Sequence, residues 1–299
     1  MIKETLLVDI KRNALDDGPG IRTLVFFKGC PLSCVWCQNP EAKSLHKEIS
    51  FNKDICSECG SCLEVCNQNA IDFSYQFRIY RSNCNLCGKC IEICPNDALK
   101  FVGQNYSIES LIEIILKDRV FYNNSGGGVT LSGGEPLYHI DYVKNLVKKL
   151  KKKAIHICIE TCGYYNQEKF YEHILPFIDL IYFDLKIYEP DLHAKFCSVS
   201  NEKILANFED LIKNQSIEVI PRIPLIPNIT DTDENLSKLA NYLITLNIRK
   251  IILLPYNPLW LSKTATIGIA PTYNYSKWLD NKNKTRIKSI FSHFEFNNF

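Results

Sequence analysis

Three cysteines near the beginning of the chain have the spacing of an iron–sulfur site. Cys30, Cys34 and Cys37 lie within eight residues, so their thiolates can bind three irons of one [4Fe-4S] cube. The fourth iron then has no protein ligand and stays open to a small molecule. A reduced cluster with an open iron can bind S-adenosylmethionine and pass one electron to its sulfonium, and the triad predicts this chemistry.

Two longer cysteine runs follow the triad. Each has the spacing Cys-x2-Cys-x2-Cys-x3-Cys, which is typical of bacterial two-cluster ferredoxins, where the fourth cysteine of a run binds the other cube. One predicted [4Fe-4S] cluster is therefore bound by Cys56, Cys59, Cys62 and Cys94. The other is bound by Cys66, Cys84, Cys87 and Cys90. Both cubes are closed by four thiolates, so we expect them to carry electrons and to bind no substrate.

Disulfides and zinc are the alternative uses of these cysteines. The first residues lack a basic region followed by a long apolar run, so we expect no secretory signal and a cytoplasmic location, where thiols stay reduced. Zinc could bind two Cys-x2-Cys pairs, but it does not explain two four-cysteine runs of identical spacing. The remaining thiols, Cys158, Cys162 and Cys197, have no ligand spacing and are expected to be buried and unreactive.

The composition excludes several classes of partner. The 299 residues are 46% apolar and carry a net charge of +2, so a core can form and no overall basic field indicates nucleic acid. No apolar run reaches the ~18 residues of a membrane span. We therefore expect a globular protein without a nucleic-acid or membrane partner.

Strand-like and helical segments alternate along most of the chain. Six short apolar segments predict strands: 23–28, 128–131, 155–159, 180–183, 218–223 and 250–254. Helices are expected between them, including 107–117, 142–152, 168–174 and 236–246. The alternation predicts an α/β fold with a parallel sheet. Six units are too few for a closed eight-fold barrel, so we expect a partial (β/α)6 barrel.

One segment interrupts this alternation. Residues 51–102 contain both four-cysteine runs and form two similar halves, as expected for a ferredoxin-like two-cluster domain. We therefore predict three parts: residues 1–50 begin the barrel and carry the triad, 51–102 form the insert, and 103–299 complete the barrel with a C-terminal extension.

Polar motifs follow several of the predicted strands. They are Ser132-Gly133-Gly134-Glu135, then Glu160, and then Asp184-Leu185-Lys186. Because functional groups gather at the carboxyl ends of parallel strands, these motifs predict one shared site with the triad. Glycines let backbone carbonyls approach a ligand's ammonium group, and Glu135 can add charge. The carboxylates and the lysine could bind a ligand or form a structural salt bridge, and Arg222 and Asn257 are weaker candidates.

Several longer motifs carry a resemblance to a known family. They are Asp17-Gly18-Pro19-Gly20-Ile21-Arg22, the triad within residues 29–41, Ser125–Pro136, Glu160-Thr161-Cys162-Gly163, Asp184-Leu185-Lys186 and Leu253-Leu254-Pro255-Tyr256. In these the chain resembles the radical S-adenosylmethionine (radical SAM) superfamily. More narrowly, it is similar to the activating enzymes of glycyl radical enzymes, in the ferredoxin-insert type related to pyruvate formate-lyase activating enzyme.

The resemblance implies roles for individual residues. Cys30, Cys34 and Cys37 would hold the catalytic cube. The residues implied in binding S-adenosylmethionine are Trp36 and Gln38 at the adenine, Gly133, Gly134 and Glu135 at the methionine amine, and Asp184, Leu185 and Lys186 at the ribose or carboxylate. A monovalent cation would lie near Glu160 and Asp184. Asn257 stands where many relatives have a cofactor-contacting histidine.

The resemblance also implies a reaction and partners. The enzyme would cleave S-adenosylmethionine reductively to a 5′-deoxyadenosyl radical, which removes a hydrogen atom from a backbone glycine of a partner glycyl radical enzyme. A flavodoxin or ferredoxin-type donor would supply the electron. The alternatives are another radical SAM enzyme, acting on a small molecule or peptide, and an iron–sulfur electron-transfer protein.

Overall fold

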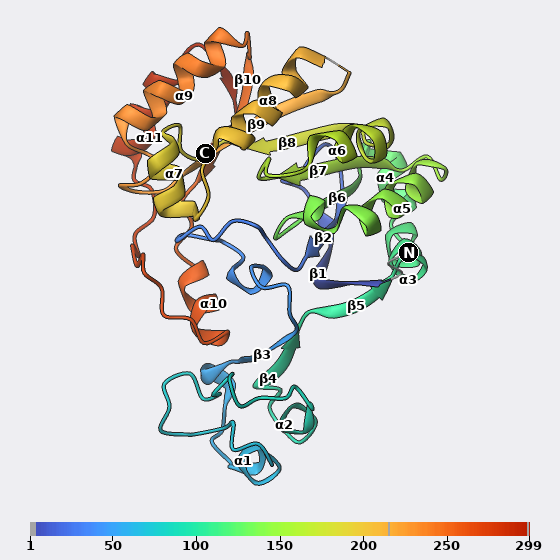
Figure 1. Cartoon of the computed structure of the whole chain (residues 1–299), viewed down its shortest axis with the longest axis vertical. Coiled ribbons are helices and arrows are strands. Elements are labelled where there is room, and N and C mark those ends of the chain that lie inside the picture. Colours follow the sequence, from blue (N-terminus) through green and yellow to red (C-terminus); the bar gives the residue numbers. More distant parts are fainter. Residues whose placement is uncertain (1–3, 215, 298) are drawn as a thin grey trace.

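A nine-stranded sheet forms the centre of the molecule (Figure 1). The computed structural model describes residues 4–214, 216–297 and 299. Six neighbouring strands of the sheet run parallel: β2 (Arg22–Phe27), β6 (Gly128–Gly133), β7 (His156–Thr161), β8 (Leu180–Asp184), β9 (Glu218–Leu225) and β10 (Lys250–Pro255). The prediction of a parallel α/β sheet is therefore confirmed, and its six strands overlap the six predicted segments.

Three further strands complete the sheet. β1 (Glu4–Ala14) pairs antiparallel with β2, β5 (Gln104–Ser107) pairs antiparallel with β1, and β11 (Glu295–Phe296) pairs parallel with β10. Among the described strands the two edges, β5 and β11, do not pair with each other, so the sheet stays open. Sequence patterning missed β1 because charged residues occupy much of its second half.

Helices cover the outer side of the sheet. The longer ones are α3 (Ile108–Leu116), α5 (Ile140–Lys151), α8 (Glu202–Asn214), α9 (Asp233–Thr245) and α11 (Asn281–Ile290). The shorter ones are α4 (Arg119–Ser125), α6 (Gln167–His173) and α7 (Pro190–Cys197), whereas α10 (Trp260–Thr266) lies apart from them beside the insert (Figure 1). As expected from the sequence, Ser107 caps α3 by accepting the amide of Ser110. No helix among the described residues is long and apolar enough to cross a membrane.

The insert projects from one end of the molecule (Figure 1). Its stem is an antiparallel pair, β3 (Glu48–Phe51) and β4 (Leu99–Val102), with Phe51 opposite Leu99. Between these strands lie two short helices, α1 (Ser61–Glu64) and α2 (Lys89–Glu92). A left-handed glycine precedes each helix, Gly60 at φ 84° and Gly88 at φ 83°, so the two halves repeat the same local geometry.

Candidate functional site

A cavity of about 220 Å³ lies at the carboxyl ends of the parallel strands. We call it the catalytic cavity. Its lining residues are Cys30, Leu32, Cys34, Trp36, Cys37, Gln38, Asn39, Ser132, Gly133, Gly134, Glu160, Thr161, Cys162, Asp184, Lys186, Arg222, Pro224, Ile226, Leu254 and Pro255. The cysteine triad and the polar residues that follow β6, β7 and β8 therefore face one space.

The loop that carries the triad follows β2 and is held by backbone hydrogen bonds. The amide of Gly29 donates to Ala42 O at 2.7 Å, and the amides of Ser33 and Val35 donate to carbonyls at the end of α7 at 2.9 and 3.0 Å. These bonds, two of them to α7, hold the irregular triad loop so that its three thiols face one cavity. Three soft thiolate donors in one cavity fit a [4Fe-4S] cluster.

Gly134 lies where two loops cross at the cavity wall. A Cβ at this position would lie 2.2 Å from Gly29 O and 2.6 Å from Ala42 O, both backbone atoms that cannot easily move. Its amide donates to Phe27 O at 2.8 Å. The glycine is therefore needed so that the loop after β6 can touch the backbone of the triad loop.

Glu135 does not line the catalytic cavity. Its carboxylate is fully buried and accepts hydrogen bonds from the amide of Leu137 at 3.1 Å, the hydroxyl of Thr161 at 3.0 Å and the amide of Cys162 at 2.7 Å. Burial raises the pKa of Glu135 despite these donors. The sequence suggested that Glu135 adds charge near a ligand's ammonium, whereas the structure places its carboxylate where it holds the start of the loop after β7.

Four charged residues form one wall of the catalytic cavity. Arg222 donates from Nη1 to Glu160 Oε1 at 2.5 Å and from Nε to Asp184 Oδ1 at 2.8 Å. Lys186 Nζ donates to Asp184 Oδ2 at 2.9 Å, and Ser132 Oγ donates to Glu160 Oε2 at 2.5 Å. Burial alone would raise the pKa of Asp184, but Arg222 and Lys186 lower it. Both carboxylates are thus salt-bridged and still face the cavity.

Arg222 is the central residue of this wall, although the sequence indicated it only weakly. It lies in β9 directly opposite Asp184 of β8, and its side chain is 11% exposed. A single arginine within the apolar run of a predicted inner strand was the available signal, because such a charge must find partners inside the sheet.

Two other predicted site residues lie outside the cavity. Leu185 is buried in the hydrophobic core, and its amide donates to Arg222 O at 2.9 Å. Asn257 Oδ1 accepts the amide of Leu259 at 2.9 Å and so caps the turn before α10. Trp36 and Gln38, in contrast, both line the cavity, and the Trp36 side chain is buried.

Two cysteines without ligand spacing lie next to the triad. Cys162 lines the catalytic cavity, and Cys197 is fully buried at the end of α7. Their thiols lie within hydrogen-bonding reach of the thiols of Cys30 and Cys34 respectively. Burial raises the pKa of Cys162 well above its ordinary value. The expectation that these thiols are buried is confirmed, and their position beside the triad is new.

The insert contains two smaller cysteine-lined cavities, each of about 20 Å³. We call the first the inner cavity; its cysteines are Cys66, Cys84, Cys87 and Cys90. We call the second the outer cavity; its cysteines are Cys56, Cys59, Cys62 and Cys94. Each cavity combines three cysteines of one run with the fourth cysteine of the other run. Most of the remaining lining is apolar or backbone.

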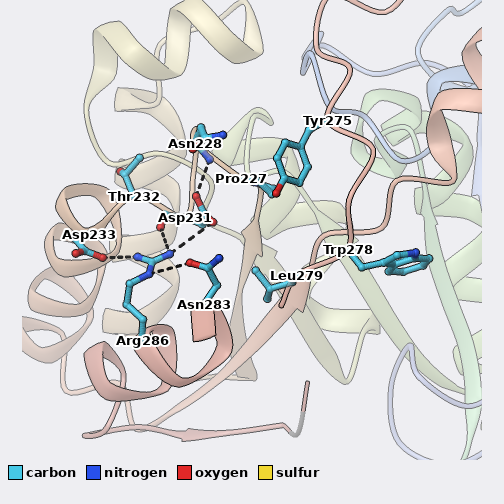
Figure 2. Close-up of a pocket in the computed structure, with 10 residues that line it drawn as sticks. All are labelled: Pro227, Asn228, Asp231, Thr232, Asp233, Tyr275, Trp278, Leu279, Asn283 and Arg286. Carbon is cyan, nitrogen blue, oxygen red and sulfur yellow. Dashed lines mark hydrogen bonds and ion pairs between the residues drawn. The ribbon is translucent and has the colours of Figure 1, made fainter. Parts of the chain in front are cut away.

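A further cavity of about 320 Å³ lies between the loop after β9 and the C-terminal segment (Figure 2). Arg286 points into it from α11 and bonds the carboxylate of Asp233, the backbone oxygen of Asp231 and the side chain of Asn283. These charged groups bond one another, and none of the lining residues belongs to the catalytic cavity.

Comparison with known proteins agrees with this architecture. The Radical SAM superfamily matches residues 24–240. The trans-4-hydroxy-L-proline dehydratase activating enzyme of Clostridioides difficile is 41% identical, over 98% of this chain and 97% of its own length. The choline trimethylamine-lyase activating enzyme of Oleidesulfovibrio alaskensis is 34% identical over the same shares.

Two further proteins extend the comparison. The 4-hydroxyphenylacetate decarboxylase activating enzyme of Clostridium scatologenes is 37% identical over 95% of this chain and 92% of its own length. A crystal structure of a radical SAM methyltransferase from Sphaerobacter thermophilus matches 98% of this chain and 76% of its own with a TM-score of 0.54 at 14% identity, and so shares the fold. The chain therefore belongs to the radical SAM superfamily and, within it, to the activating enzymes of glycyl radical enzymes.

Proposed function

We propose that the catalytic cavity binds one [4Fe-4S] cluster and S-adenosylmethionine, and that the insert binds two further clusters. The observation that carries the proposal is that three thiols, a glycine loop and a charged wall face one cavity at the carboxyl ends of the sheet. A bound, reduced cluster supplies the electron that splits S-adenosylmethionine into methionine and a 5′-deoxyadenosyl radical.

The residues of the cavity would bind and orient the cofactor. Cys30, Cys34 and Cys37 would hold the cluster with three thiolates, so that a cluster iron without a protein ligand would be available to the amine and carboxylate of S-adenosylmethionine. Lys186 lines the same cavity as the triad, and its ammonium can attract the carboxylate. Trp36, largely buried at the cavity edge, offers an apolar surface for the adenine.

The remaining wall residues would hold the ribose or a monovalent cation. Glu160 and Asp184 each use one oxygen for Arg222 and the other for Ser132 or Lys186. A carboxylate oxygen has more than one lone pair, so ribose hydroxyls or a cation can still be bound. Arg222 pairs with both carboxylates and aligns them at the cavity surface.

The composition of the inner and outer cavities supports two auxiliary clusters. Each presents four thiols from both cysteine runs in an otherwise mostly apolar space. A zinc ion would need several of these thiols around one point. Thiolates of a cube each bind a different iron and need no common ion. We propose that a flavodoxin or ferredoxin-type donor in an anaerobic cytoplasm supplies electrons to the two auxiliary clusters.

The substrate of the radical is a backbone glycine of a partner glycyl radical enzyme. Hydrogen-atom transfer from its α-carbon gives 5′-deoxyadenosine and a glycyl radical, so one electron and one molecule of S-adenosylmethionine are used per activation. The open sheet leaves its two edges unpaired within the described chain. A loop of the partner could therefore reach the cavity without passing through a closed barrel.

The test compares two cysteine variants under anaerobic conditions. The reconstituted protein, Cys34→Ala and Cys158→Ala are reduced with dithionite and given S-adenosylmethionine, and 5′-deoxyadenosine is measured. Cys158 is a matched control because it is fully buried and lies outside the catalytic cavity. We expect product from the wild type and Cys158→Ala and none from Cys34→Ala. No product from a wild-type protein with a full iron content would overturn the proposal and favour an electron carrier.

The partner is then identified by its radical. Purified glycyl radical enzymes are incubated with the active protein, and the glycyl radical is detected by electron paramagnetic resonance (EPR). Formation of 5′-deoxyadenosine with no radical on any such enzyme, but with a modified small molecule or peptide, would favour a different radical SAM reaction.

A further inference from the structure

We propose that α10 fixes the position of the inner cavity relative to the triad loop, and that electrons reach the catalytic cluster through the inner cavity. Arg81 is the positioning residue, because it joins α10 to the wall of the inner cavity. The inference rests on the proposed function, because it assumes clusters in both places. The step is a one-electron transfer: a flavodoxin or ferredoxin-type donor is oxidised by one electron, and the catalytic cluster is reduced by the same electron.

One side of α10 holds the loop that carries the triad. Lys263 Nζ donates to Gln38 O at 3.1 Å, to Asn39 Oδ1 at 3.4 Å and to Glu41 Oε1 at 3.1 Å. Gln38 and Asn39 line the catalytic cavity directly after Cys37. The position of α10 is therefore linked to the last ligand of the catalytic cluster.

The other end of α10 holds the insert. Arg81 Nη2 donates to Thr266 O at 3.4 Å and to Ile49 O at 3.2 Å, and Nη1 donates to Ile79 O at 3.4 Å. Ile49 and Ile79 both line the inner cavity. In addition, the amide of Cys84 donates to Arg81 O at 3.3 Å, so one residue connects α10 with the wall and a predicted ligand of the inner cavity.

The chain after α10 is shaped to receive this arginine. Gly268 has φ 72°, and a Cβ at this position would lie 1.8 Å from Arg81 Nη1. Only glycine combines this backbone conformation with room for the guanidinium. The contact therefore needs both the guanidinium of Arg81 and the glycine at position 268, although the two residues are far apart in the sequence.

Within the described part of the chain, the arginine of the outer cavity makes no corresponding link to the barrel. Arg78 lines it as Arg81 flanks the inner cavity, but Arg78 donates to Glu58 at 2.9 Å and packs over Phe73 and Phe51. All of these partners belong to the insert. In Figure 1, α1, which supplies Ser61 to the outer cavity, lies at the end of the insert far from the sheet.

This difference determines the order of electron transfer. Transfer between clusters slows steeply with distance, so a contact that sets the position of one cavity has a large effect on the rate. Through Arg81 and Lys263, α10 connects the wall of the inner cavity with the triad loop, whereas the contacts of Arg78 at the outer cavity stay within the insert. Electrons that enter at the outer cavity would therefore pass through the inner cavity.

The experiment measures reduction of the catalytic cluster in Arg81→Met, with Arg119→Met, an exposed position on α4, as the control for an arginine-to-methionine change. Reduced flavodoxin is mixed with each protein, and samples are freeze-quenched for EPR; the catalytic cluster is recognised by the change of its signal when S-adenosylmethionine is added. We expect Arg81→Met to slow this reduction about tenfold. Arg119→Met should have little effect. Titanium(III) citrate, a small reductant that can reach the catalytic cavity directly, should reduce every variant at the wild-type rate.

A second variant separates positioning from folding of the insert. Gly268→Ala displaces the guanidinium of Arg81 without changing any residue of the insert, and it should slow flavodoxin-driven reduction in the same way with unchanged iron content. Wild-type rates in both Arg81→Met and Gly268→Ala would overturn the inference, as would equal slowing with both reductants. If the wild type fails to cleave S-adenosylmethionine with titanium(III) citrate, the proposed function itself is wrong.

Discussion

The catalytic cavity and the two cavities of the insert are all lined by cysteine thiols, but they differ in volume and in the charge of their walls. The catalytic cavity has three triad cysteines and a volume of about 220 Å³. Each insert cavity has four cysteines and about 20 Å³. Cys162 also lines the catalytic cavity, so the cavities differ in the spacing of their cysteines and in volume rather than in the number of cysteines. In the proposed function, three ligands in the larger space would leave room for S-adenosylmethionine beside the cluster, whereas four ligands in the smaller space would hold a cluster that only passes electrons.

The walls of the cavities differ as much as their cysteines. Glu160, Asp184, Lys186 and Arg222 all face the catalytic cavity. The inner and outer cavities are instead lined mainly by apolar side chains and backbone, with one cation each, Lys89 or Arg78. A zwitterionic ligand needs charges of both signs, whereas a closed cluster needs sulfur ligands and exclusion of water. The lining therefore reflects what each cavity must bind.

Loss of one cysteine from each region should give the largest contrast. Cys30→Ala removes a ligand from a site that has only three, so we expect no detectable 5′-deoxyadenosine. Cys94→Ala removes one of four ligands in the outer cavity, so dithionite-driven cleavage should persist while iron content falls. Product and iron are measured together. Equal loss of product in both variants would mean that the two regions do not work separately.

The next largest difference between the regions is expected when a glycine of each is replaced by alanine and S-adenosylmethionine binding is compared. In Gly134→Ala the new Cβ meets Gly29 O and Ala42 O, so the triad loop must shift, and we expect S-adenosylmethionine binding, measured by equilibrium dialysis, to fall at least about tenfold. In Gly60→Ala no atom lies within 4 Å of the new Cβ. Only the cost of a left-handed alanine remains, about 1–2 kcal/mol, and binding should be unchanged.

Removal of an arginine tests the charged wall. Arg222→Met leaves the buried carboxylates of Asp184 and Glu160 without their shared partner, which should lower the free energy of unfolding by about 3–5 kcal/mol. Arg78→Met breaks an ion pair whose partner, Glu58, is 65% exposed, so the loss of the ion pair itself should cost less than about 1 kcal/mol. Anaerobic urea unfolding followed by circular dichroism measures both. Similar decreases in the free energy of unfolding of the two variants would show that the ion pairs of Arg222 contribute no more to stability than the ion pair of Arg78 does.

The smallest expected effect is on the pH dependence of folding stability, to which Asp17 near the catalytic cavity and Asp72 in the insert contribute with opposite signs. Burial, followed by repulsion from Glu160, raises the pKa of Asp17 from 3.8 to about 6. The folded state then binds more protons than the unfolded state between these values, so this group contributes stability at low pH that is lost as the pH rises towards 6. In the insert, hydrogen bonds from Ser74 lower the pKa of Asp72, so its contribution is lost as the pH falls.

Two neutral variants measure this contrast. Asp17→Asn should become more stable relative to wild type as the pH is raised from 4 to 7. Asp72→Asn should become slightly less stable over the same range, because Asp72 is exposed. Thermal unfolding is compared at several pH values under anaerobic conditions. A shift of the same sign in both variants would contradict the assigned causes.

The local patterns were predicted well because their causes are local. Six strands and most of the helices between them follow from runs of apolar residues and from caps such as Ser107. The triad follows from covalent spacing, since thiols within eight residues remain close in almost any loop. The prediction missed β1 and α7 because their patterns are weak, although α7 supports the triad loop through two backbone bonds.

The sequence by itself thus determined the cysteine spacings, the parallel sheet and the strand ends at which the polar motifs lie. Only the tertiary structure decided that Arg222 joins Glu160 to Asp184, that Glu135 and Asn257 turn towards backbone amides, and that α10 links the triad loop to Arg81. These contacts join segments that are far apart in the sequence. They depend on strand register and on the direction of individual side chains, and no local pattern of residues encodes either.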